Sequence, residues 1–221
     1  MSGTLALVGG GEFSEGCTFD VGLWEASGAS EVLVLPTGAA YEHPDRLVEK
    51  AVSWFAQMGA TVRGLDVLAR PDAMNEDYAV TVAASQFTYL VGGSPMHARS
   101  VLKDSPVWDA LVAAWRDGGT LAGSSAGAMV FCDPMVDPRG GAFTLGLGLI
   151  DGVTVVPAHD HWSEEAAHRT RKMTPAGQVV AGIDERTALI RDTDGSWRAE
   201  GAGQVVVFRG GEPADMSALP T

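Results

Sequence analysis

The sequence predicts an α/β protein with a mostly parallel sheet, helices on both faces and antiparallel strands added toward the C-terminus. Short runs rich in Val and Leu do not alternate with polar residues, which is typical of strands buried on both faces. Amphipathic helical patterns separate the early runs through about residue 130. From Val179 onward, short strands and turns such as "RDTDGSW" indicate hairpins. We expect one domain over residues 1–221.

The apolar runs predict seven strands. In chain order they cover residues 4–9, 31–36, 87–93, 120–123, 153–157, 179–183 and 187–190. The runs are short, and glycine, proline or polar residues bound them, so strands are favoured over buried helices.

Two helices are predicted with defined ends. Residues 44–58 begin at Pro44, a first-turn residue, and stop at Gly59. Residues 106–117 follow Ser105, a capping residue type, and stop at Gly118. Their apolar faces are Leu47, Val48, Ala51, Phe55 and Met58 in the first, and Trp108, Leu111, Val112 and Trp115 in the second.

Composition excludes several function classes. The 221 residues carry a formal net charge of −13, which disfavours nucleic acid and anionic membranes as partners. Only two cysteines occur, and no Lys or Arg precedes Arg46, so neither a disulfide framework nor a secretory signal is expected. Neither CxxC nor HExxH is present, so no metal is expected. The default location is cytoplasmic.

The stretch "LAGSSAGAMV" (121–130) predicts a nucleophile elbow. Gly123-x-Ser125-x-Gly127 lies where a strand should turn sharply into a helix. Such a turn strains the serine backbone, and glycines two residues before and after relieve the crowding. Ser124 is the rival nucleophile, but its flanking residues are Ala122 and Ala126. The alternative is that these small residues only allow close helix packing.

A catalytic serine requires a base and an orienting acid. Of five histidines, His159 and His161 follow a predicted strand end, where parallel α/β sheets place reactive groups. Asp184 and Glu185 follow another strand end, and rival carboxylates after the elbow are Asp133 and Asp137. The residues alone leave the acid open.

The predicted oxyanion donors are the backbone N–H groups of Gly93 and Ala126. Gly93 lies in "YLVGGSPMH", where a strand gives way to a helix opened by Pro95. The other glycine loop, "VGGGE" (8–12), fails the G-x-G-x-x-G dinucleotide pattern because Ser14 replaces the last glycine. We interpret it as a strand-end turn near the site.

Five stretches together resemble peptidase family S51, which includes aspartyl dipeptidase and cyanophycinase. They are "LVGGGE", "VGGS", "GSSAGAM", "GLGLIDGVTVVPAHD" and "AGIDERTAL", in the family's order from residue 7 to about 190. The resemblance implies a class I glutamine amidotransferase-like, flavodoxin-like three-layer fold. A serine replaces the cysteine nucleophile of those amidotransferases.

By position, the resemblance makes Ser125 the nucleophile and His159 its base. Glu185 matches the acid of the cyanophycinase branch, whereas the dipeptidase branch takes an aspartate soon after the elbow, pointing to Asp133 or Asp137. The chain departs from the family after "VGG", where it has Ser94-Pro95. It departs again in "HDHWSEEAAHRTRK" (159–172), where cyanophycinases have a phenylalanine and spaced arginines.

The expected function is hydrolysis of short peptides or isopeptides, with aspartyl residues preferred. Arg99, Arg169 and Arg171 are the candidate carboxylate-binding residues. No cofactor is expected, the partner is a small peptide substrate, and the protein is a monomer or homodimer. The alternatives are a small-molecule amidase or esterase and an inactive binding relative.

Overall fold

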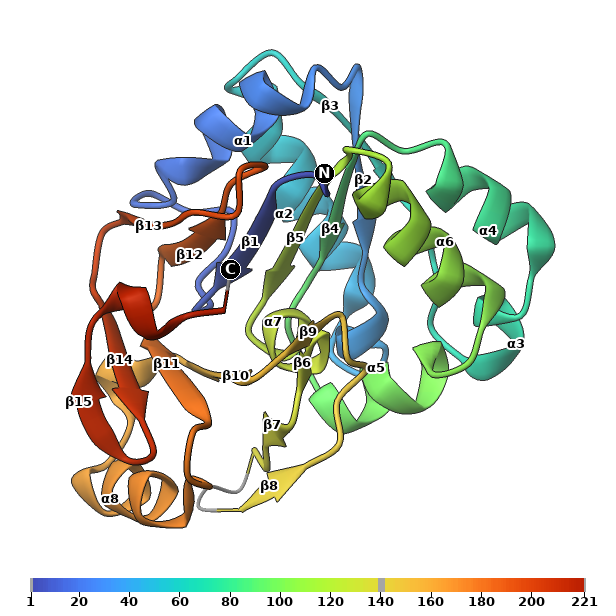
Figure 1. Cartoon of the computed structure of the whole chain (residues 1–221). Coiled ribbons are helices and arrows are strands. Elements are labelled where there is room, and N and C mark those ends of the chain that lie inside the picture. The colour runs from blue at the N-terminus through green and yellow to red at the C-terminus, as the bar shows by residue number, and fades with distance from the viewer. Residues whose placement is uncertain (1, 139–141, 221) are drawn as a thin grey trace.

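The computed structural model describes residues 2–138 and 142–220 and is organised around a seven-stranded sheet (Figure 1). The strand order across the sheet is β13-β12-β1-β5-β4-β2-β3. The strands are β1 (Leu5–Val8), β2 (Glu31–Leu35), β3 (Thr61–Gly64), β4 (Phe87–Leu90), β5 (Thr120–Ser124), β12 (Thr187–Arg191) and β13 (Trp197–Gly201).

The centre of this sheet is parallel and one edge is antiparallel. Strands β1, β5, β4, β2 and β3 all run in the same direction. Strand β12 runs antiparallel to β1, and β13 antiparallel to β12. The pairing of β1 with β5 sets Ser124 opposite Val8, so the loops that leave these two strands start side by side. The predicted α/β class with a parallel core is confirmed.

Helices cover both faces of the sheet. On one face, α1 (Phe19–Ser27) and α2 (Pro44–Ala56) pack on a core that includes Val8 and Tyr89. The opposite face carries α4 (Glu76–Ala83), α5 (Pro95–Leu102), α6 (Pro106–Arg116) and α7 (Ala126–Phe131), beside the short α3 (Arg70–Ala73). Both helices predicted with defined ends are present. Ser105 caps α6 as expected, because its hydroxyl accepts the Trp108 N–H.

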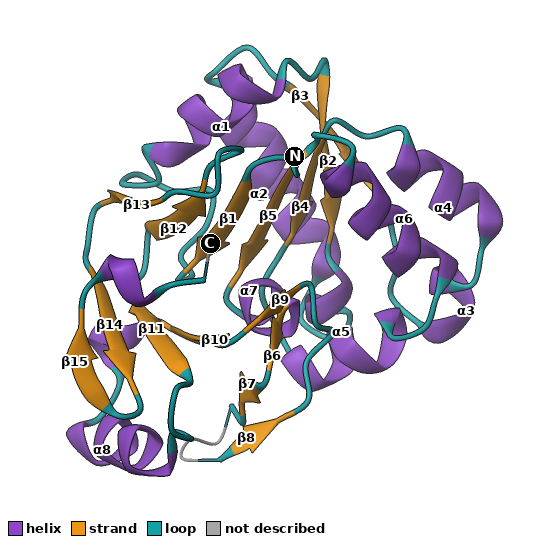
Figure 2. Ribbon diagram, viewed as in Figure 1, coloured by secondary structure: helices purple, strands orange, loops and turns teal. Residues whose placement is uncertain are grey.

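A second sheet lies beside the first, with α8 (Glu164–Met173) beneath it in this view (Figure 2). Its order is β10 (Val153–Pro157), β11 (Val179–Ile183), β14 (Val205–Arg209) and β15 (Glu212–Ala214). The pair β10–β11 is parallel, and the later strands add in antiparallel fashion. The predicted antiparallel C-terminal strands are therefore present, and two of the predicted buried strands belong to this second sheet.

Two very short pairs connect α7 to the second sheet. They are β6 (Cys132–Asp133) with β9 (Ile150–Asp151), and β7 (Met135–Val136) with β8 (Phe143–Thr144). Three 3₁₀ turns complete the described chain: η1 (Thr37–Ala39), η2 (His159–His161) and η3 (Met216–Ala218). No helix within residues 2–138 or 142–220 has the length and apolar character needed to cross a membrane.

Candidate active site

Ser125 lies on the sharp turn between β5 and α7. Its backbone angles are φ 49° and ψ −110°, a conformation that side-chain-bearing residues rarely adopt. Its N–H donates to the Val8 carbonyl at 2.8 Å, which fixes the turn on β1. A methyl group at Gly123 would lie 2.7 Å from the carbonyl carbon of Gly127, so the expected crowding around the serine is present.

Ser124 has a different environment from Ser125. It is fully buried, and its hydroxyl donates a 2.7 Å hydrogen bond to the Glu12 carboxylate. Ser125 is only partly buried. Of the two adjacent serines, Ser125 is therefore the one that a substrate can reach.

The glycine loop after β4 packs directly against the Ser125 turn. A methyl group at Gly92 would lie 3.3 Å from the Ser125 Cβ. Gly93 has φ 117°, and the next residue, Ser94, donates its N–H to the Gly38 carbonyl at 2.8 Å. Within the described residues, the N–H groups of Gly93 and Ala126 donate to no acceptor of the chain. They are available to an oxyanion.

The histidine turn is anchored to the end of β1. Turn η2 follows β10, and Ala158 at its start has φ 46°. The Ala158 N–H donates to the Gly9 carbonyl at 2.7 Å. This hydrogen bond brings His159 and His161 to the sheet edge from which Ser125 emerges.

Three histidine–carboxylate contacts form at this edge, and in one of them the His161 Nε2 is 3.5 Å from an Asp160 carboxylate oxygen. The His159 Nδ1 is 3.9 Å from an Asp184 carboxylate oxygen, and the His161 Nε2 is 3.6 Å from a Glu185 carboxylate oxygen. The structure thus sets Glu185 against His161 and Asp184 against His159. A methyl group at Gly10 would lie 3.9 Å from both the Glu185 Cγ and the Ser125 Cβ, so Glu185 is separated from Ser125 by little more than one glycine.

The two histidines differ in exposure. The His159 side chain is 25% exposed and the His161 side chain 66%. Burial lowers the pKa of His159, and the positive charge of Arg171 acts in the same direction. The negative charges of Asp184 and Asp160 oppose this lowering of the His159 pKa. At neutral pH the imidazole is therefore neutral, as a general base must be.

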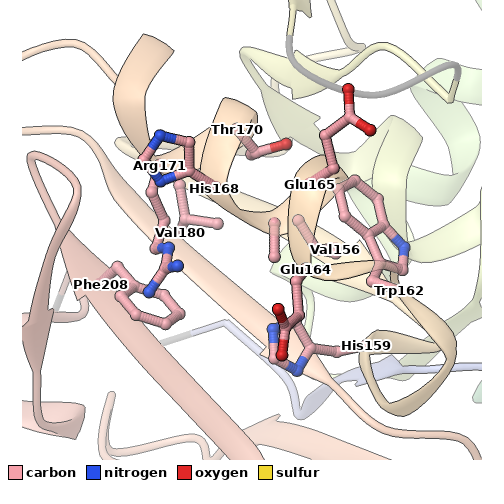
Figure 3. A pocket seen from close by; sticks show the side chains of 12 residues that line it. Val156, His159, Trp162, Glu164, Glu165, His168, Thr170, Arg171, Val180 and Phe208 are labelled. Carbon is pink, nitrogen blue, oxygen red and sulfur yellow. The ribbon is translucent and has the colours of Figure 1, made fainter.

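A cavity of about 690 Å³ opens between α8 and the second sheet, with His159 in its wall (Figure 3). Apolar walls come mainly from Val156, Trp162, Val180 and Phe208. The polar lining consists of His159, Glu164, Glu165, His168, Thr170 and Arg171. Ser125 is not among the described residues that line this cavity.

The three predicted arginines are dispersed. Arg171 lines the cavity with its guanidinium 5.3 Å from the centre of the Phe208 ring. Arg169 forms a 3.0 Å surface ion pair with Glu165, one turn away on α8. Arg99 donates its Nε–H to the Gly146 carbonyl at 3.1 Å. The arrangement therefore brings only Arg171 into one cavity with His159.

Of the rival carboxylates after the elbow, Asp133 lies in β6 and Asp137 directly follows β7. Asp133 accepts the Gly146 N–H at 3.1 Å, and the Asp137 N–H donates to the Ala142 carbonyl beside β7 and β8. Cys132, which directly follows α7, is fully buried, and burial raises the pKa of its thiol to about 12. Such a thiol is not a nucleophile at neutral pH.

Sequence reasoning overlooked Glu12, which is only 7% exposed and bonds to the elbow through Ser124. Its signal was a carboxylate directly after the strand-end glycines of "VGGGE".

Among the described residues, no group of three or more His, Cys, Asp and Glu side chains is arranged to hold a metal ion.

Comparison with known proteins identifies the family. The model of peptidase family S51 matches residues 5–196. A cyanophycinase of Trichormus variabilis is 30% identical over 210 residues, covering 86% of this chain and 67% of that protein. A cyanophycinase of Geminocystis herdmanii is 26% identical over 201 residues, covering 85% of this chain and 73% of that protein.

A solved structure has the same fold. The crystal structure of a peptidase from an acI-B1 Actinobacterium superposes with a TM-score of 0.85 at 30% identity, covering 95% of this chain and 92% of that one. The matched region spans the elbow, the glycine loop after β4 and the histidine turn. This chain belongs to peptidase family S51 and is a serine-type peptidase.

Proposed function

We propose that this peptidase hydrolyses short peptides or isopeptides with Ser125 as the nucleophile. The observation that carries the proposal is the strained Ser125 backbone, with a positive φ, between Gly123 and Gly127. In such an elbow the hydroxyl is presented at the end of the sheet rather than bonded into it.

The reaction proceeds in two halves. The Ser125 Oγ attacks the peptide carbonyl while a histidine takes its proton, and the Gly93 and Ala126 N–H groups receive the oxyanion. The histidine then returns the proton to the leaving amine, which departs and leaves an acyl-enzyme. Water attacks this ester by the same route, releasing the acid and restoring Ser125.

We propose His159 as the base. Its lowered pKa keeps it neutral at physiological pH, and its position after β10 matches the family resemblance. The resemblance assigns Glu185 as its acid, whereas the 3.9 Å contact favours Asp184. Asp184 and Glu185 directly follow β11, so the chain offers both carboxylates at the same sheet edge.

One observation favours a second arrangement. His161 pairs with Glu185, and Glu185 lies across Gly10 from Ser125. In this arrangement His161 takes the proton and Glu185 orients it, while His159 and Asp184 contribute to the neighbouring cavity.

Single substitutions separate these arrangements. We compare His159→Ala, His161→Ala, Asp184→Asn and Glu185→Gln by kcat on one dipeptide. Loss of a relay member costs orders of magnitude, and losses within one relay do not add. If His159→Ala and Glu185→Gln are the two single variants with severe defects, the family triad is supported. Severe defects in His159→Ala and Asp184→Asn instead support Asp184 as the acid. Severe defects in His161→Ala and Glu185→Gln support the second arrangement.

Ser125→Ala tests the proposal as a whole. It should abolish both hydrolysis and labelling by a fluorophosphonate probe, while the matched variant Ser124→Ala is still labelled, at a reduced rate. A dead Ser124→Ala beside an active Ser125→Ala would reject the assignment. An unlabelled wild type would instead indicate an inactive binding relative, and turnover of simple esters without dipeptides would indicate a small-molecule esterase or amidase.

For the substrate, we propose a preference for an aspartyl residue at the cleaved bond. Arg171 supports it, because a half-buried guanidinium over an aromatic ring suits bidentate carboxylate binding. Two glutamates also line the cavity, but Glu165 is paired with Arg169. The relatives are named cyanophycinases. We favour short peptides over that polymer because this chain departs from the family in residues 159–172.

The test is kcat/KM for Asp-Leu, Ala-Leu and Lys-Leu in the wild type and three variants. Arg171→Ala should lose the aspartyl preference, while Arg169→Ala and Arg99→Ala should keep it. A single well-formed charged contact is worth about 1.5–3 kcal/mol, or roughly 10- to 150-fold. Preference for Lys-Leu, or an aspartyl preference that survives Arg171→Ala, would reject the proposal.

A further inference from the structure

Glu12 is a buried carboxylate that bridges two distant segments of the chain. One carboxylate oxygen accepts the Gly92 N–H at 3.2 Å. The other accepts the Ser124 hydroxyl at 2.7 Å. The side chain is 7% exposed, and both of these hydrogen bonds are buried. A carboxylate is retained in such a place only when hydrogen bonds compensate its desolvation.

Both partners of Glu12 immediately precede the groups assigned to chemistry. Gly92 precedes Gly93, a proposed oxyanion donor, and Ser124 precedes the proposed nucleophile Ser125. A methyl group at Gly92 would lie 3.3 Å from a Glu12 carboxylate oxygen and 3.3 Å from the Ser125 Cβ. The carboxylate, the glycine loop and the nucleophile are thus in continuous contact.

We propose that Glu12 is a positioning residue that fixes the distance between the nucleophile and the oxyanion donors. It touches no reacting atom and acts through Gly92 and Ser124. The loop and the elbow follow different strands, β4 and β5, and each could relax separately if their common acceptor were absent. The inference rests on the proposed role of Ser125.

The Glu12 backbone is held from outside the site as well. Lys50, an exposed residue on α2, donates from its Nζ to the Glu12 carbonyl at 2.6 Å. Lys50→Met removes this hydrogen bond and keeps much of the side-chain length. It therefore perturbs the Glu12 position without opening a hole in the interior.

The experiment compares Glu12→Ala with the isosteric Glu12→Gln. The glutamine carbonyl can accept the Gly92 N–H, and its NH₂ can donate to the Ser124 hydroxyl, which also accepts. The substitution therefore keeps both connections. The readouts are the rate at which a fluorophosphonate labels Ser125, the kcat and KM on a dipeptide, and the thermal midpoint.

Glu12→Ala should label roughly 100-fold more slowly with an unchanged KM, because ångström-scale misplacement of reacting groups costs about that much. Glu12→Gln should stay within roughly tenfold of wild type, the equivalent of one hydrogen bond. Ser124→Ala should slow labelling less than Glu12→Ala, and the double variant should be no slower than Glu12→Ala alone.

The outcomes separate this inference from the proposed function. A wild type that the probe does not label at Ser125 overturns both. A labelled wild type, with a folded Glu12→Ala that reacts within about threefold of it, overturns only the role of Glu12. If Glu12→Ala does not fold, the labelling rates of Ser124→Ala and Lys50→Met test the role of Glu12 instead. Slower labelling of these two variants, at the thermal midpoint of the wild type, supports the inference. Labelling of both variants at the wild-type rate rejects it.

Discussion

Replacing Asp20 with Asn should make the stability of the protein much less dependent on pH. Asp20 lies in α1 and is fully buried. One carboxylate oxygen accepts the Trp54 indole N–H at 2.8 Å. The other is buried and has no hydrogen-bond partner in the described part of the chain. An ionised carboxylate is poorly compensated in this environment.

The size of the effect follows from the pKa. Burial raises the pKa of Asp20 from 3.8 to about 7, with a further increase from the Glu12 charge and an opposing effect of the Trp54 hydrogen bond. Between these values the unfolded chain releases the Asp20 proton, while the folded chain keeps it. The contribution of Asp20 to the free energy of unfolding is therefore complete below pH 3.8 and is lost as pH rises to about 7. At 1.36 kcal/mol per pH unit, the loss is about 4 kcal/mol.

The assay is urea unfolding of wild type and Asp20→Asn from pH 4 to pH 8. The difference between their free energies of unfolding removes contributions from groups that titrate equally in both. It should move by up to about 4 kcal/mol in favour of Asp20→Asn as pH rises. Asp66→Asn, at an exposed position, is the matched control and should show no such trend. A difference constant within about 1 kcal/mol would refute the reasoning.

Three further results are expected. Gly127→Ala should destabilise the fold by about 2 kcal/mol or more, because its methyl group would lie 2.2 Å from the Leu90 carbonyl oxygen, and chemical unfolding measures this loss. The same substitution should abolish Ser125 labelling. If His159 is the base, kcat/KM should rise with pH through a midpoint below 6.5, and Arg171→Ala should move that midpoint upward because a cation that lowers the His159 pKa is lost. Ser105→Ala should reduce the free energy of unfolding by about 1 kcal/mol without changing kcat, since it removes a buried helix cap.

The parallel core could be predicted because its strands are apolar on both faces. The one strand of the large sheet that this pattern missed before residue 130 is β3, at the sheet edge. Its four residues are mostly exposed, so burial imposes no apolar run on "TVRG". The same pattern identified β10 and β11 but could not indicate that they form a separate sheet. An apolar run indicates that a strand is buried, but it does not indicate with which other strand that strand pairs.

The elbow was predictable because its constraint is local. Glycine spacing around Ser125 follows from crowding within one turn, and the expected backbone strain is present as a positive φ of 49°. The contacts of Glu12 are not local: its partners Gly92 and Ser124 are 80 and 112 residues away. A single carboxylate after a glycine turn gives no indication of such partners until the strand order is known.

The histidine partner of each carboxylate was hard to predict for another physical reason. Asp184 and Glu185 are adjacent at the end of β11, and the structure gives each a different histidine. Adjacent residues leaving a strand point in different directions, so a shift of one position exchanges their partners. The sequence placed both carboxylates at the correct sheet edge, but which histidine each meets depends on the turn after the strand.

Burial distinguishes the His159–Asp184 pair from the His161–Glu185 pair more than distance does. His161 is mostly exposed, and exposed ion pairs contribute only about 0.2–1 kcal/mol, because water screens them. His159 is mostly shielded, and its partner Asp184 is held by the Gln204 N–H at 2.9 Å. A fixed carboxylate in a shielded site stabilises the imidazolium of the transition state more strongly. Proximity to Ser125 through Gly10 favours His161 instead. Since a base must be neutral before the reaction and stabilised when charged, the electrostatics of the site favour His159.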